Sequence, residues 1–247
     1  QGCERGTRSI IAAARPAPTA VRPAKSLTST LPRGYPAVVP HDAAPAVRRF
    51  RTAELLSVGS EITAGETRDT NAGDLARDLT RAGVRVRQLT AVPDRLDIVR
   101  EAFERAASRS DLVVATGGLG PTPDDLTRES IAAVLGEEPT VDPDAEAWLR
   151  ELWRRRGLPF PDLNLKQAWL IPSAMSIPNA NGTAPGWWVT TASGAVIVAL
   201  PGPPREMRPM WRDWVLPRLR ECGLGEEQEI RTYRLTGIGE SALADLL

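Results

Sequence analysis

The segment Gly117–Thr127 (GGLGPTPDDLT) holds the residue types best suited to bind phosphates. Its glycines, Gly117, Gly118 and Gly120, let the backbone approach a ligand closely and adopt positive φ angles. An apolar run at 111–116 precedes the segment and a helical pattern follows it. The free amides and dipole of that helix start would favour an anion. The order strand, glycine loop, helix therefore predicts a phosphate site.

Hydroxyl and carboxylate side chains accompany these glycines. Hydroxyls that can donate hydrogen bonds to phosphate oxygens belong to Thr116, Thr122 and Thr127. Asp124 and Asp125 would repel bare phosphates unless a cation lay between them, and oxygen ligands suit Mg²⁺ or a similar hard ion. A structural alternative stays open, in which Thr122 or Asp124 caps the helix and the glycines make a tight turn.

Carboxylates also follow two other predicted strands. Glu61 lies within Gly59–Gly65 after the first strand, Asp69–Asn71 opens the next helix, and Asp94 follows the second strand. In an open parallel sheet, ligands bind beyond the carboxyl ends of the strands, so these side chains should approach the glycine loop. Helix capping alone would also explain Asp69 and Asp94.

Two Gly/Pro-rich turns, Asn179–Gly186 and Leu200–Met207, flank one strand of a predicted hairpin. Turn chemistry alone would explain them, and a share in ligand contact is the open alternative. The candidate binding residues are Gly59, Ser60, Asp69, Asn71, Thr116, Gly117, Gly118, Gly120, Pro121, Thr122, Thr127, Asn181, Gly182, Thr183, Pro201, Gly202 and Glu206. The candidate catalytic residues are Asp125, Asp94 and Glu61, and the candidate metal ligands are Asp124 and Asp125.

The elements that must position these residues alternate between strands and helices. Apolar runs or alternation predict strands at 54–59, 84–92 and 111–116, and helical spacing predicts helices at 70–82, 94–109 and 126–135. A helix at 144–156, a hairpin over 186–200 and a closing helix at 207–219 follow. This order implies βαβ units and an α/β fold with a mostly parallel sheet covered on both faces.

The two ends of the chain differ from this central domain, residues 51–225. Residues 1–50 hold eight Arg or Lys, two acids and seven prolines without a regular period, which predicts a disordered tail. Such a tail is consistent with a transit peptide, with the end of a fragment, or with sequence translated ahead of the true start of the protein. A strand begins at Ile230 and a helix at 237–241, so residues 226–247 are expected to start a second, truncated domain.

Composition excludes several classes of site from the central domain. The one histidine is His41 and the cysteines are Cys3 and Cys222, which leaves no His-based triad, zinc site or disulfide framework. We therefore expect the protein in a reducing compartment, the cytoplasm. No apolar run approaches the ~20 residues that span a bilayer. Residues 51–247 carry a net charge of −6, which argues against nucleic-acid binding.

Five ordered motifs together resemble the N-terminal domain of the CinA (competence/damage-inducible) family, within the MoaB/Mog-like molybdopterin-binding superfamily. They are GSE at 59–61, DTN at 69–71, the glycine loop at 117–127, NGTAPG at 181–186 and LPGPP with EM at 200–207. The resemblance spans about residues 51–247. It implies a three-layer α/β/α fold and a metal-dependent ADP-ribose pyrophosphatase that uses Mg²⁺ or Co²⁺, with potassium as activator.

The resemblance also carries expectations for single residues and for rival functions. The essential aspartate of Mog-like adenylyltransferases corresponds to Asp125, and a second functional aspartate corresponds to Asp94. Asp94 or Glu61 would orient a water or accept its proton. Molybdopterin binding or adenylylation is one alternative. The other is a non-enzymatic binding or oligomerisation module of a longer protein whose C-terminal nicotinamide-nucleotide deamidase domain is absent from this chain. Whatever the function, we expect a homo-oligomer.

Overall fold

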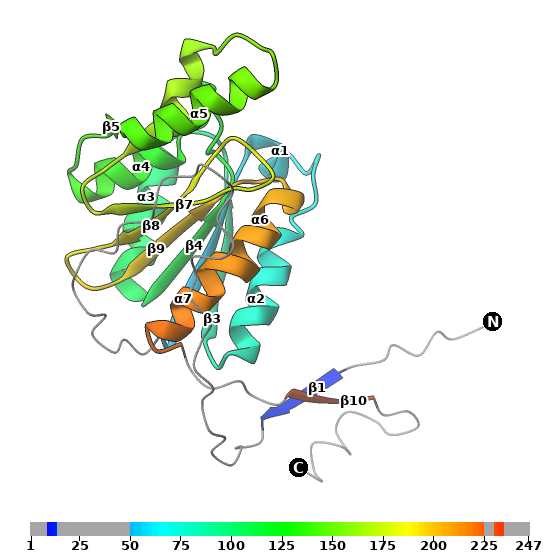
Figure 1. Ribbon diagram of the computed structural model, residues 1–247. Coiled ribbons are helices and arrows are strands. Elements are labelled where there is room, and N and C mark those ends of the chain that lie inside the picture. The colour runs from blue at the N-terminus through cyan, green and yellow to red at the C-terminus, as the bar shows by residue number, and fades with distance from the viewer. Residues whose placement is uncertain (1–8, 14–49, 225–229, 235–247) are drawn as a thin grey trace.

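A six-stranded sheet forms the centre of the computed structural model, which describes residues 9–13, 50–224 and 230–234. The strand order is β3-β2-β4-β9-β8-β7 (Figure 1). The strands are β2 (Thr52–Val58), β3 (Arg85–Val92), β4 (Leu112–Thr116), β7 (Ala174–Ile177), β8 (Gly186–Thr190) and β9 (Val196–Leu200). β3, β2, β4 and β9 run parallel, while β8 is antiparallel to β7 and β9. The predicted mostly parallel sheet is confirmed.

Helices cover both faces of the sheet and make the three expected layers (Figure 1). One face carries α2 (Asn71–Arg81), α6 (Pro204–Met210), the π-helical turn η3 (Trp211–Val215) and α7 (Leu216–Glu221). The other face carries α3 (Leu96–Arg109) and α4 (Thr127–Leu135). Alternate β4 residues point to opposite faces, so Val114 packs with the first group and Val113 with the second. Burial on both faces explains the continuous apolar run of this strand.

The predicted closing helix at 207–219 is confirmed as one helical run over residues 204–221, in which the π-helical turn η3 lies between α6 and α7. Pro209 lies inside α6 and Pro217 near the start of α7. Each proline lacks the N–H that a regular α-helix uses, which accounts for the local departure from α-helical geometry.

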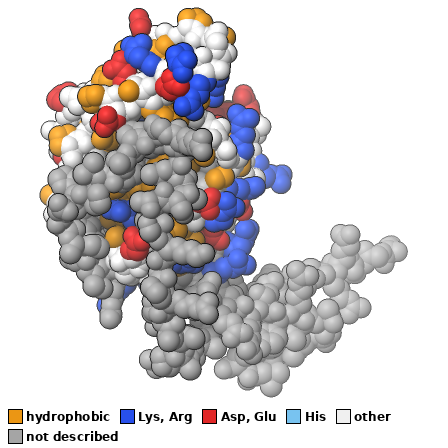
Figure 2. Space-filling view, in the orientation of Figure 1, with side chains coloured by type: hydrophobic (Ala, Val, Ile, Leu, Met, Phe, Trp, Pro, Cys, Tyr) orange, Lys and Arg blue, Asp and Glu red, His pale blue; other side chains and the backbone are white. Residues whose placement is uncertain are grey.

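Residues 140–170 form a projecting arm over the carboxyl edge of the sheet. The arm contains β5 (Thr140–Val141), α5 (Pro143–Arg155), the 3-10 turn η2 (Asp162–Ala168) and β6 (Trp169–Leu170). Trp148 and Leu149 are buried in a small apolar cluster of its own. Side chains of both charge signs lie among apolar and uncharged ones on its face that Figure 2 shows. In the arm, Arg154 and Arg155 hold the pKa of Glu151 at about 2 through hydrogen bonds and their charge.

Two short strands near the chain ends pair with each other. β1 (Ser9–Ala13) lies antiparallel to β10 (Ile230–Arg234), where a strand was predicted. For residues 9–13 the structure differs from the predicted disorder, because a pairing partner so far along the chain leaves no mark in a local pattern. The rest of segment 1–49 and the predicted helix at 237–241 lie outside the described residues. Within the described parts of the chain, no helix is long and apolar enough to cross a membrane.

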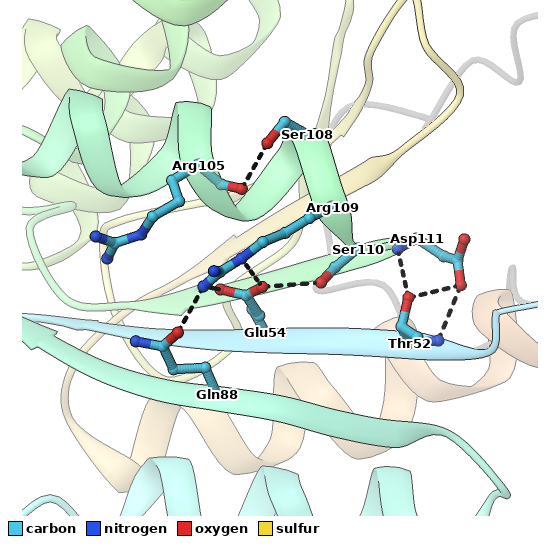
Figure 3. Close-up of polar contacts among 8 residues, drawn as sticks. All are labelled: Thr52, Glu54, Gln88, Arg105, Ser108, Arg109, Ser110 and Asp111. Carbon is cyan, nitrogen blue, oxygen red and sulfur yellow. Dashed lines mark hydrogen bonds and ion pairs between the residues drawn. The ribbon is translucent and has the colours of Figure 1, made fainter.

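A charged cluster fastens the amino-terminal half of β2 to α3 (Figure 3). Glu54 is buried, with 1% of its side chain exposed, and Arg109 binds it through two bonds of 2.6 and 2.8 Å. Ser110 Oγ donates a third bond to Glu54, and Arg109 donates another to Gln88. The carboxylate therefore replaces lost solvation with three hydrogen bonds, and it raises the pKa of Arg109.

Removing either partner of this pair is expected to have unequal effects. The Arg109 side chain is 36% exposed, so after Glu54→Gln its charge can turn to water. After Arg109→Met the Glu54 carboxylate stays buried with Ser110 as its main donor. We expect a loss of about 2 kcal/mol for Arg109→Met and about 1 kcal/mol for Glu54→Gln in urea unfolding. Equal losses would contradict this account.

Candidate functional site

The carboxyl ends of the four parallel strands surround a cavity of about 690 Å³. The loops after β2, β3, β4 and β9 line it, as the sequence predicted for the edge of an open sheet. Residues 181–184 and the end of α5 close its other side. Every predicted site residue lies in the lining except Ser60, Thr122 and Thr127.

The glycine loop is held tightly against β2 and α4. Gly117 and Gly118 have φ angles of +98° and +62°, which favour glycine. A Cβ atom at Gly117 would lie 2.0 Å from the carbonyl oxygen of Val58. Thr127 is fully buried, and its hydroxyl and amide donate to the carbonyls of Gly117 and Gly118 at 2.8 and 3.1 Å. Thr127 therefore holds the loop in place without lining the cavity, contrary to its predicted contact with ligand.

A short turn orients the Asp125 carboxylate beside this loop. The amide and the hydroxyl of Thr122 donate to Asp125 Oδ2 at 2.9 and 2.5 Å. The carboxylate lies over Gly120, where an added Cβ would be 2.3 Å from Oδ2. The Thr122 hydroxyl is thus engaged by Asp125, which corrects its predicted role as a phosphate donor. A Cβ atom at position 120 would overlap the Asp125 carboxylate in this orientation, which is why glycine suits the position.

Asp124 and Asp125 both line the cavity. Among residues 9–13, 50–224 and 230–234, no three Asp, Glu, His or Cys side chains gather closely enough to hold a metal ion. Mg²⁺ often takes one or two carboxylates and completes its shell with substrate phosphates and water. Asp124 and Asp125 supply oxygen atoms of the kind that such a cation takes.

The other predicted acids have partners of their own. Asp69 accepts from Ser57 Oγ at 2.5 Å and from the Ala72 amide at 3.0 Å, so it helps to hold the start of α2. It also lines the cavity, and its contact with a ligand stays a prediction. Asp94 Oδ2 accepts from the Ser60 amide at 2.7 Å, and Ser60 Oγ accepts from the Asp94 amide at 3.1 Å. This reciprocal pair joins the loops after β2 and β3, while Asp94 still lines the cavity.

The two Gly/Pro-rich turns are tied together at the opposite wall. Asn179 Nδ2 donates to Glu206 Oε2 at 2.8 Å, and the same carboxylate lies against Gly182. Asn71 Nδ2 donates to the Gly202 carbonyl at 2.7 Å, which links α2 to the second turn. Glu206 is 8% exposed and also lines the cavity, and its contact with a ligand stays a prediction.

Comparison with known proteins decides the family. Residues 54–221 match the family model described as "Probable molybdopterin binding domain". The chain belongs to this family. A CinA-like protein of Deinococcus deserti is 54% identical over 195 residues, which cover 79% of this chain and 48% of that relative. A CinA-like protein of Deinococcus radiodurans is 52% identical over 198 residues, with the same two coverages.

A solved CinA structure extends this result to the fold. The protein CinA from Thermoplasma acidophilum has 35% sequence identity and a TM-score of 0.63, over 70% of this chain and 99% of that one. The predicted resemblance to CinA proteins is confirmed. The chain spans about half the length of the Deinococcus relatives.

This CinA-like domain also uses residues that the sequence patterns did not reveal. Arg128 is fully buried and donates to the carbonyls of Leu119 and Pro185 at 2.8 and 2.9 Å. It thereby joins the glycine loop to the turn at 181–186. Arg128 lies at an inward position of the helix predicted at 126–135, and a charged residue in such a position could have indicated a structural role. Further cavity residues that we did not predict are Val58, Ile62, Thr67, Arg68, Thr70, Leu119, Arg156, Gln167, Ala184, Pro203, Pro204 and Arg205.

Proposed function

We propose that this domain binds a phosphorylated, nucleotide-like ligand and, with a divalent cation, hydrolyses its phosphoanhydride bond. ADP-ribose is the first substrate to test. The observation that carries the proposal is that the glycine loop, together with its own Asp124 and Asp125, lines one cavity. Its volume of about 690 Å³ lies within the range of about 300–1,000 Å³ typical for small-molecule sites.

Each wall of the cavity would have a distinct task. The amides of the glycine loop would bind phosphate oxygens. Asp125 and Asp124 would hold Mg²⁺ or Co²⁺, and a bound cation would neutralise charge and lower the pKa of water. Asp94, anchored through Ser60, or Glu61 would orient the attacking water or accept its proton. We also propose that potassium activates the reaction.

The runner-up function is molybdopterin binding or adenylylation in the same cavity. The description of the matching family model favours it. A third candidate is a ligand-binding or oligomerising module of a longer protein, favoured by the match to about half of each Deinococcus relative. A cytoplasmic location, a homo-oligomeric state and the absence of nucleic-acid partners belong to the proposal as well.

One set of assays separates these candidates. The purified chain is incubated with ADP-ribose and Mg²⁺ or Co²⁺, with and without K⁺, and the release of AMP and ribose 5-phosphate is followed. We expect turnover that a chelator abolishes and that either divalent ion restores. Adenylylation of molybdopterin in the presence of ATP, without ADP-ribose turnover, would favour the runner-up. Binding of either ligand without any reaction would support the module.

A further inference from the structure

Lysine is rare in this chain, and one lysine is placed beside the candidate site. The 31 basic residues include only two lysines, Lys25 and Lys166. Lys166 is buried, with 9% of its surface exposed. Lysine differs from arginine in offering a compact charge that can direct several hydrogen bonds from one atom. A position that holds lysine in so arginine-rich a sequence suggests a need for that geometry.

The ammonium group of Lys166 connects three separate segments. Its Nζ atom donates to the carbonyl oxygen of Thr122 at 3.0 Å and lies 2.6 Å from Glu129 Oε1. Lys166 belongs to η2 in the arm, Thr122 to the glycine loop and Glu129 to α4. The ring of Trp169 lies 5.9 Å from the ammonium. The lysine therefore fastens the arm to both ends of the segment that carries the aspartates.

The contact with Thr122 leads directly to Asp125. Thr122 receives the lysine bond at its carbonyl and gives both its amide and its hydroxyl to Asp125 Oδ2. Lys166 itself does not line the cavity, whereas its neighbour Gln167 does. Its contact with the turn beside the cavity is the bond to the Thr122 carbonyl.

We propose that Lys166 is a positioning residue that holds the Thr122–Asp125 turn in the geometry needed for cation and phosphate binding. This inference rests on the proposed hydrolytic function for its activity readout. Glu129 pairs with Lys166 but makes no bond to Thr122 like that of the lysine. A substitution of Glu129 therefore serves as the control. Loss of the ion pair and loss of the Thr122 contact can therefore be separated.

The test compares Lys166→Met with Glu129→Gln in the full chain. Both variants lose the charged pair, so both should lower the melting temperature. Only Lys166→Met removes the bond to Thr122, so its kcat/KM for ADP-ribose with Mg²⁺ should fall at least about tenfold. Glu129→Gln should change kcat/KM by no more than about threefold. Arg100→Met, which removes an exposed ion pair with Glu104 on α3, controls for a lost surface charge.

Several outcomes would overturn the inference. Equal losses of kcat/KM in Lys166→Met and Glu129→Gln would show that only the ion pair matters. Full activity of Lys166→Met would show that the turn holds itself. If that variant does not fold, Lys166→Arg replaces it: the charge is kept, but the longer planar group should displace Thr122 and lower kcat/KM. An active, correctly folded Lys166→Arg enzyme would then refute the role.

Failure of the proposed hydrolysis remains distinguishable from failure of this inference. If the wild-type chain turns over no ADP-ribose, the affinity for ADP-ribose with Mg²⁺, measured by calorimetry, replaces kcat/KM for all variants. A wild type that binds while Lys166→Met binds at least about tenfold more weakly supports the positioning role without hydrolysis. Equal affinities, or no binding by the wild type, reject it.

Discussion

Replacing Asp125 with Asn should lower kcat for ADP-ribose hydrolysis by about a thousandfold, since losing a cation ligand costs several kcal/mol of charge stabilisation. The fold should survive, because an asparagine carbonyl can still accept the two bonds from Thr122. The space over Gly120 also suits a side chain of the same shape. The variant therefore isolates the charge at this position.

The measurement pairs turnover with metal titration. The concentration of Mg²⁺ needed for half-maximal rate should rise in Asp125→Asn together with the fall in kcat. Asp97→Asn is the matched control, since Asp97 is 68% exposed on α3, pairs with Arg95 and lies outside the cavity. Full turnover by Asp125→Asn at ordinary Mg²⁺ concentrations would remove this residue from the catalytic assignment.

The second large effect is expected on stability, at Gly117. An alanine there must adopt a φ of +98° and would place Cβ 2.0 Å from the backbone oxygen of Val58. A backbone atom at the end of β2 cannot move aside without disturbing the central strands. We expect Gly117→Ala to cost about 3 kcal/mol or more, and to lower the melting temperature by roughly 6–12 °C. Phosphate binding at the loop should be lost as well.

Two glycines provide controls for this substitution. Gly157 has a φ of +67° with open space around an added Cβ, so Gly157→Ala should show the conformational cost alone, about 1 kcal/mol. Gly73 lies inside α2 with no atom within 4 Å of an added Cβ, so Gly73→Ala should stabilise the helix slightly. A melting temperature for Gly117→Ala close to that of Gly157→Ala would mean that the clash with Val58 is relieved.

Both predictions concern the part of the site that local sequence patterns predict well. The strand at 111–116, the three glycines and the following helix are contiguous, so apolar runs, helical spacing and glycine chemistry reveal them locally. The neighbouring loops could be assigned to the same edge because parallel strands place their carboxyl ends together. The individual roles were harder to predict, as Thr122 and Thr127 show.

The amino-acid sequence by itself determined the α/β order, the parallel sheet and the edge where the ligand loops meet. These features follow from periodicity and turn chemistry within a few neighbouring residues. The tertiary structure alone decided which polar groups face the cavity and which hold the loops. Arg128 and Lys166 find their partners Pro185 and Thr122 only after segments remote in sequence have packed. Hydrogen-bond partners set by that packing leave no local period to detect.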